Sequence, residues 1–297
     1  MKFRAFAFGP AVLAAWLFAL PISAQAREAL RIAVASNFAP TLETLIQSYQ
    51  SEFPDAPEIT LSTGSTGAHY ALISRGAPFD LFFAADNSRP EKLVENATAI
   101  AQRAYAIGIP VLVLPQGEQG EATSAQSIGA LMKGKRIAIA DPALAPYGIA
   151  AMQVIQWAGL DPQSDLELIY GANAGLAASL FALKTSDGAI IAKSQLSQIK
   201  AHRDFRAIAL PQASHTPVWQ NVALISDRPE ARAFYEWSTT SDAARAIIGQ
   251  EGYLLAMISG ETDARASYSQ DGAIQNATPK IAAQTSIQPQ TKSAATQ

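Results

Sequence analysis

The chain has 297 residues, of which 49% are hydrophobic and 16% are charged, and its formal net charge at pH 7 is −3. This composition is typical of one large or two medium-sized globular domains. The sequence has no long run of Lys and Arg, which argues against a nucleic-acid-binding surface. The absence of cysteine excludes disulfides, thiolate catalysis and cysteine-ligated metals.

The first residues have the three parts of a secretion signal. Lys2 and Arg4 make the start positive, an apolar stretch covers residues 5–20, and a small-residue cleavage pattern, Ala-Gln-Ala, occupies residues 24–26. We therefore predict that residues 1–26 are a cleaved signal peptide and that the mature protein is periplasmic. Loss of the two positive charges would change the net charge from −3 to −5. The alternative is an uncleaved membrane anchor, for which the stretch is short.

The region after the signal alternates between short apolar runs typical of strands and stretches with helical spacing of apolar residues. We expect, in chain order, a strand at 30–35, a helix at 41–53, a strand at 59–63, a helix at 66–75, a strand at 81–84, a helix at 89–95, an extended run at 105–114 interrupted at Pro110, a strand at 137–140, a helix at 148–158, a strand at 166–170, a helix at 175–184, strands at 189–192, 207–210 and 218–225, and helices at 229–238 and 241–250. This alternation predicts an α/β protein with mostly parallel sheets flanked by helices.

Four segments share one design, in which a strand ends, a short polar turn follows and a helix begins. They are residues 35–38, 63–67, 141–148 and 171–175. The first N–H groups of a helix lack partners within the helix, and the helix dipole makes that end positive. Such turns lie at the carboxyl ends of parallel strands and suit an oxyanion. For any one turn, the alternative is a Ser or Asn that simply caps its own helix.

The order of these segments resembles the molybdate- and tungstate-binding periplasmic proteins of ABC importers. The resemblance runs from Leu30 to Leu255, and its most specific part is Gly76–Asp86. The other matching segments are Val34–Phe38, Gly64–Gly67, Arg89–Leu93, Tyr105–Gly108, Ile139–Pro142 with Pro146–Gly148, Ala231–Tyr235 and Glu251–Tyr253. The resemblance implies a two-lobed type II periplasmic binding protein fold with a ligand cleft between the lobes.

The resemblance also implies a set of ligand-binding residues, namely Ser36, Asn37, Ser65, Tyr147 and Ala174. All would donate hydrogen bonds to the oxygens of molybdate or tungstate. Ser36, Ser65 and Tyr147 would thus hold the metal through those oxygens and not by direct coordination. One branch of the family has a ligand-binding Tyr where this chain has Ile191, and another has an apolar residue there and a Tyr at the position of Tyr147. This chain fits the second branch, with Gly175 forming part of a small turn.

The resemblance and the composition together predict the organisation of the chain. Residues 27–107 with 219–258 would form lobe 1 and residues 108–218 lobe 2. Residues 259–297, rich in Ser, Thr, Ala and Gln, would be a flexible tail. The expected protein is a monomer without catalytic residues or a cofactor. Its expected partners are the permease and ATPase of a molybdate importer.

Other functions remain open at this stage. The ligand could be sulfate, phosphate or a small organic anion, and the protein could serve sensing in place of transport. A serine hydrolase using Ser65 is opposed by Thr63, which stands where the G-x-S-x-G motif requires glycine.

Overall fold

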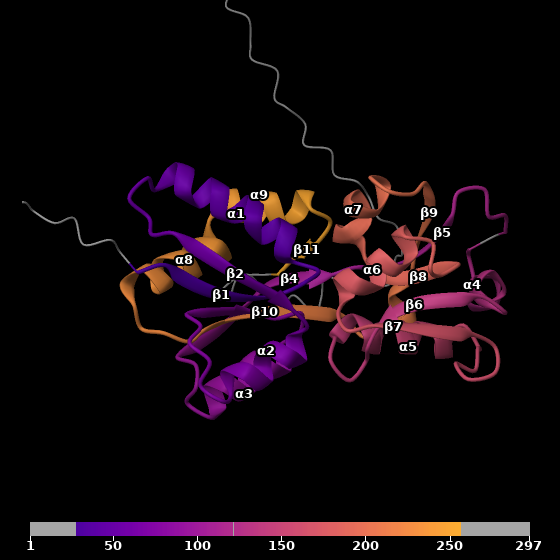
Figure 1. Cartoon of the computed structure of the whole chain (residues 1–297), viewed down its shortest axis with the longest axis horizontal. Coiled ribbons are helices and arrows are strands. Elements are labelled where there is room, and N and C mark those ends of the chain that lie inside the picture. Colours follow the sequence, from indigo (N-terminus) through magenta and orange to yellow (C-terminus); the bar gives the residue numbers. More distant parts are fainter. Residues whose placement is uncertain (1–27, 121, 257–297) are drawn as a thin grey trace, which may run out of the picture.

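The computed structural model describes residues 28–256 except residue 121, and within them the chain folds into two α/β lobes (Figure 1). The predicted signal peptide and the predicted tail lie outside the described residues. Within the described part of the chain, no helix combines the length and the apolar character that crossing a membrane requires.

Lobe 1 is built on a six-stranded sheet with the order β11-β4-β10-β3-β1-β2. Its strands are β1 (Leu30–Ala35), β2 (Ile59–Gly64), β3 (Leu81–Phe83), β4 (Ala101–Gly108), β10 (Val218–Leu224) and β11 (Leu254–Leu255). Its helices are α1 (Ala39–Glu52), α2 (Thr66–Ile73), α3 (Ser88–Glu95), α8 (Pro229–Thr240) and α9 (Asp242–Gln250).

Lobe 2 is built on a five-stranded sheet with the order β7-β6-β8-β5-β9. Its strands are β5 (Pro110–Pro115), β6 (Arg136–Ala140), β7 (Glu167–Gly171), β8 (Gly188–Ala192) and β9 (Phe205–Ala209). Its helices are α4 (Ala125–Met132), α5 (Pro146–Trp157), α6 (Ala174–Ala182) and α7 (Leu196–Lys200), with the short 3-10 turns η1 (Lys193–Gln195) and η2 (Gln212–Ser214).

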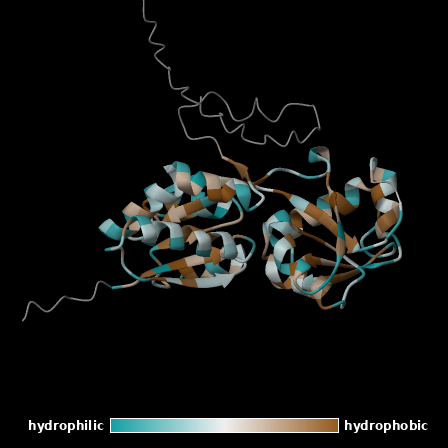
Figure 2. Ribbon diagram, turned by 90° about the horizontal axis from the view of Figure 1, so that it is seen from above, coloured by the Kyte–Doolittle hydropathy of each residue, from teal (hydrophilic) through white to brown (hydrophobic). Residues whose placement is uncertain are grey.

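Each sheet is covered by helices on both faces. Side chains alternate between the faces of a strand, so an apolar strand presents apolar side chains to the helices on both sides. In β1, Ile32 and Val34 pack against α1, α8 and α9, whereas Ala33 lies in the cluster formed with α2 and α3. In β5, Leu112 belongs to the core under α4 and α5, and Val113 to the core under α6. Figure 2 shows the hydrophobic strands, in brown, within both lobes.

The sheets are mixed, whereas the sequence predicted mostly parallel ones. The pairs β1–β2, β1–β3, β6–β7 and β6–β8 are parallel, but β10 runs antiparallel to β3 and β4, and β5 runs antiparallel to β8 and β9. The short strand β11 is also antiparallel, to β4. The strands β5 and β10 both follow a crossing of the chain from one lobe to the other: β4 of lobe 1 leads directly to β5, and η2 of lobe 2 to β10. Each enters its new sheet from the cleft side, so its direction opposes that of the strands beside it.

Candidate functional site

The four polar turns form two pairs, one in each lobe. In lobe 1 the last residues of β1 and β2, Ala35 and Gly64, are in register, and Ser36 N donates to Gly64 O at 2.9 Å. In lobe 2 Ala140 is in register with Gly171, and Asp141 N donates to Gly171 O at 2.8 Å. Each pair therefore lies at the carboxyl ends of two adjacent parallel strands, the edge at which α/β sheets bind ligands.

The two pairs of turns meet across the cleft. Gly175 N, in lobe 2, donates to Ser36 Oγ of lobe 1 at 3.0 Å. Gly67 N of lobe 1 donates to Leu144 O of lobe 2 at 2.9 Å. A third bond between the lobes joins Ser194 Oγ to Asn37 O at 3.0 Å. These bonds bring the predicted site residues of both lobes into one buried region.

Helix starts supply the donors that an anion needs at this place. Helix α2 begins after Ser65, whose Oγ accepts from Ala68 N at 3.2 Å, and α6 begins after Asn173, whose Oδ1 accepts from Leu176 N at 2.9 Å. The backbone N–H at the first position of each helix has no carbonyl one turn earlier to bind, and it points outward at the positive end of the dipole. Capping does not exclude ligand binding by Ser65, because its oxygen can accept a hydrogen bond while its proton is donated elsewhere.

The side chain of Asn37 is used inside the protein. Asn37 is 1% exposed, and its Nδ2 donates to Gln220 Oε1 at 3.0 Å and to Tyr253 Oη at 3.2 Å. Both amide protons therefore have acceptors in lobe 1. The backbone N–H is then the donor that Asn37 can offer to a ligand.

Tyr147 brings a phenol from α5 of lobe 2 into the cleft, where it is 2% exposed. Gln220 Nε2 donates to its Oη at 3.2 Å. Burial, with a smaller contribution from Tyr253, raises the pKa of Tyr147 well above its ordinary value. The hydroxyl therefore keeps its proton at neutral and mildly alkaline pH and is a neutral donor.

Small side chains let the lobes approach each other closely around these donors. An apolar cluster that spans the cleft contains Ala35, Ala85, Tyr147, Ala150, Ala174, Ala192 and Val218. Five of these seven residues are alanines, so backbone groups of the two lobes can approach a small ligand from both sides. The position of Ala174 in this cluster brings the first residue of α6 close to Tyr147 and to the end of β1.

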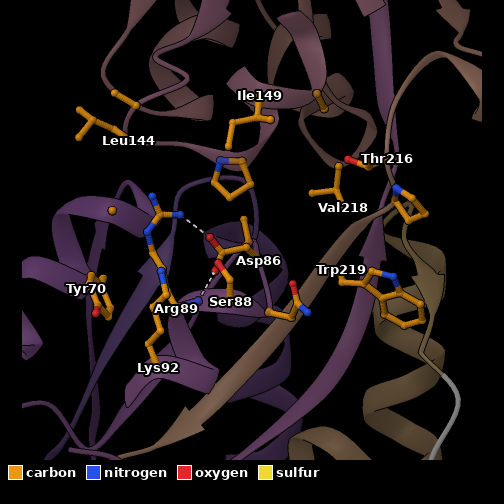
Figure 3. Close-up of a pocket in the computed structure, with 17 residues that line it drawn as sticks. Tyr70, Asp86, Ser88, Arg89, Lys92, Leu144, Ile149, Thr216, Val218 and Trp219 are labelled. Carbon is orange, nitrogen blue, oxygen red and sulfur yellow. Dashed lines mark hydrogen bonds and ion pairs between the residues drawn. The ribbon is translucent and has the colours of Figure 1, made fainter. Parts of the chain in front are cut away.

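A groove of about 530 Å³ borders this cluster and shares Ala85, Ala150 and Val218 with it. Figure 3 shows Arg89 and Lys92 of α3 on one wall and Leu144 and Ile149 of lobe 2 on the other. Its other lining residues are Gly67, Tyr70, Asp86, Asn87, Ser88, Ala143, Pro146, Thr216, Pro217 and Trp219. Arg89 is ion-paired with Asp86. None of the five predicted ligand residues lines the groove, so the cations here lie beside the candidate site and not in it.

Neither metal coordination nor serine hydrolysis is supported by the side chains that the structure describes. Within residues 28–256, residue 121 apart, no group of three or more His, Cys, Asp and Glu residues could hold a metal ion. The nearby histidine, His69, contacts Ser62 Oγ through Nε2 at 3.2 Å, whereas Ser65 Oγ accepts from Ala68 N. Ser65 is thus not arranged as the nucleophile of a Ser-His pair.

Three further residues of the cleft have no counterpart among the residues predicted from the sequence. Gln220, Ser194 and Tyr253 connect Asn37 to the rest of the site. Of these, only Tyr253 belonged to a segment that had been noticed, Glu251–Tyr253. Gln220 lies in a largely apolar strand, Ser194 in a short 3-10 turn and Tyr253 just before β11, and none of these contexts gives a sequence pattern for a polar site residue. Their partners here come from distant parts of the chain.

Comparison with known proteins identifies relatives of the whole two-lobed region. Residues 30–254 match the family model described as bacterial extracellular solute-binding protein. Two curated molybdate-binding proteins are similar: that of Azotobacter vinelandii is 28% identical over 77% of this chain and 90% of its own length, and that of Rhodobacter capsulatus 29% identical over 81% and 93%. The solved structure of the Azotobacter vinelandii periplasmic molybdate-binding protein superposes with a TM-score of 0.67 at 31% identity, covering 77% of this chain and all of that one.

Proposed function

Because this chain belongs to the bacterial extracellular solute-binding protein family, we propose that it captures molybdate or tungstate between its lobes and delivers the ion to an ABC importer. The observation that carries the proposal is the meeting of four strand-end turns across the cleft, joined by the bond from Gly175 N to Ser36 Oγ. The similarity to two molybdate-binding proteins over most of their length supports the choice of ion.

The ligand would be held by neutral donors from both lobes. Ser36, Asn37 and Ser65 would act from lobe 1, and Tyr147 and Ala174 from lobe 2. Backbone N–H groups at the starts of α2 and α6 would add partial positive charge directed at the dianion. A site of this kind binds the anion and changes no covalent bond, so we infer a binding protein and not an enzyme.

The two lobes would open and close around the ligand at the two crossings of the chain. We place lobe 1 at residues 27–107 with 219–258 and lobe 2 at residues 108–218. This division is supported by the connection of β4 to β5 and by β10, which the chain enters from lobe 2. Its partners would be a permease and an ATPase, and its compartment the periplasm, reached through cleavage of residues 1–26.

Thermal unfolding with a panel of oxyanions tests this function. A ligand that binds only the folded state raises the free energy of unfolding by about 2.7 kcal/mol at a concentration one hundred times its Kd. We expect molybdate and tungstate to raise the Tm clearly, and sulfate and phosphate to do much less because smaller tetrahedra leave the donors of the cleft too distant. Equal shifts from sulfate and molybdate would contradict the assignment.

A further inference from the structure

The side chain of Gln220 connects predicted ligand residues from the two lobes. It is 0% exposed and lies in β10, at the position where the pairing of β10 with β4 becomes irregular. Its Oε1 accepts from Asn37 Nδ2 and from Tyr105 Oη, both at 3.0 Å, and its Nε2 donates to Tyr147 Oη at 3.2 Å. One amide thus contacts Asn37 of lobe 1 and Tyr147 of lobe 2.

The partners of Gln220 fix which way its amide points. Asn37 Nδ2 can only donate, so the atom of Gln220 that faces it must be the oxygen, and the amide nitrogen must then face Tyr147. The Tyr147 oxygen accepts that N–H and cannot return its own proton to the same nitrogen. A phenol has one proton, so the proton of Tyr147 must point to another acceptor.

Glycine at position 108 leaves the space that this contact needs. Gly108 is the last residue of β4, where the chain leaves lobe 1. A Cβ at this position would overlap both Tyr147 Oη and Gln220 Nε2. The contact between Gln220 and Tyr147 therefore depends on a glycine that stands on a third segment.

We propose that Gln220 is a positioning residue that directs the hydroxyl proton of Tyr147 at the bound oxyanion. Because the Tyr147 oxygen accepts from Gln220 Nε2, the hydroxyl proton cannot be donated to that amide and is left for an acceptor in the cleft. Donors that already point at the ligand need no reorganisation on binding, and this raises affinity. The role rests on the proposed function, since it requires an anion in the cleft.

A double-mutant cycle on molybdate affinity separates positioning from a general structural role. The four proteins are the wild type, Gln220→Met, Tyr147→Phe and the double variant, each measured by calorimetry. We expect each single substitution to weaken binding by about tenfold, as the loss of a hydrogen bond to a charged group does. Gln220 would act through the Tyr147 hydroxyl, so the double variant should bind within about twofold of Tyr147→Phe alone.

A second buried glutamine, Gln195, provides the control for this cycle. Gln195 is equally buried, in lobe 2, and its Oε1 accepts from Ala192 N at 3.3 Å, so Gln195→Met removes a buried amide whose hydrogen bond is not to Tyr147. Any effect of that variant on affinity should add to the effect of Tyr147→Phe. Additive losses from Gln220→Met and Tyr147→Phe, or no loss from either, would overturn the positioning role while the wild type still binds. A wild type that fails to bind molybdate and tungstate would overturn the proposed function, and the positioning role with it.

A second variant keeps the test decisive if Gln220→Met does not fold. Gly108→Ala inserts a methyl group at the Gln220–Tyr147 contact without removing any polar atom. It should weaken molybdate binding severalfold in the wild-type background and clearly less in Tyr147→Phe, which lacks the displaced hydroxyl. Equal losses in both backgrounds would refute the proposal.

Discussion

Replacement of Ser65 by Ala separates two tasks that one hydroxyl performs in this site. As the N-cap of α2, Ser65 Oγ accepts from Ala68 N at 3.2 Å, and loss of such a cap costs about 1 kcal/mol of stability. As a ligand residue it would donate its proton to the anion, and loss of a hydrogen bond to a charged group costs about 1.5–3 kcal/mol. Ser65→Ala should therefore lower the free energy of unfolding modestly and weaken molybdate binding by roughly tenfold to a hundredfold.

Ser241 offers a matched control for the cap alone. It is the N-cap of α9, its Oγ accepts from Ala244 N at 3.1 Å, and it lies on a helix that takes no part in the cleft. Ser241→Ala should lose about the same stability as Ser65→Ala and keep wild-type affinity. Urea unfolding without ligand gives the stability of each variant, and calorimetry with molybdate gives the affinity. Wild-type affinity in Ser65→Ala, or an equal loss of affinity in Ser241→Ala, would refute the role of Ser65 as a donor.

Three further predictions follow from the charges of the site and its surroundings. Molybdate affinity should stay nearly constant between about pH 6 and pH 9, since burial raises the pKa of Tyr147 and no His would take part. Calorimetry on Lys193→Ala should show little change in affinity. A larger loss of affinity in Lys193→Ala than in Ser65→Ala would mean that the site is ionic. Burial lowers the pKa of His69 from its ordinary 6.5, so below about pH 6.5 the unfolded chain binds a proton that the folded protein resists. The free energy of unfolding, measured with urea, should therefore decrease as the pH is lowered, and it should decrease less steeply in His69→Phe. Because the net charge of the protein is negative, the exposed Lys92 in the groove should speed the arrival of the dianion, so Lys92→Gln should slow association at low salt in stopped flow and not at high salt.

Local patterns in the sequence were sufficient to predict most strands and helices but not the direction of every strand. The strand predicted at 30–35 is β1 with the same bounds, because a short buried apolar run is determined by its own residues. Helix α4 (Ala125–Met132) was missed, because its capping box has Ser127 where the usual sequence signature has Glu or Gln. The antiparallel placement of β5 and β10 depends on where the chain crosses between lobes. The apolar pattern of a strand does not indicate whether it pairs in a parallel or an antiparallel direction.

In the candidate site too, some residues could be predicted from local sequence and others could not. The turns around Ser36 and Ser65 could be predicted because each contains its own strand end, polar residue and helix start. The role of Gln220 could not, because its partners Asn37 and Tyr147 are 183 and 73 residues away in the chain. The rest of β10 is apolar apart from the adjacent Asn221, and amides in such a strand give no signal until the fold brings the three segments together.

The distribution of donors between the lobes makes ligand affinity and lobe closure one equilibrium. Ser36 Oγ receives a hydrogen bond from Gly175 N, and Asn37 O receives one from Ser194 Oγ, so the residues proposed to bind the anion also hold the lobes together. A ligand shifts a conformational equilibrium only by the difference between its affinities for the two states. The open form would present the Ser36 and Ser65 turns without those of lobe 2, so an anion would meet about half of the donors there. An oxyanion too small to reach both pairs of turns would gain little from closure, and the same contacts would therefore determine both which ion is selected and how firmly the lobes close.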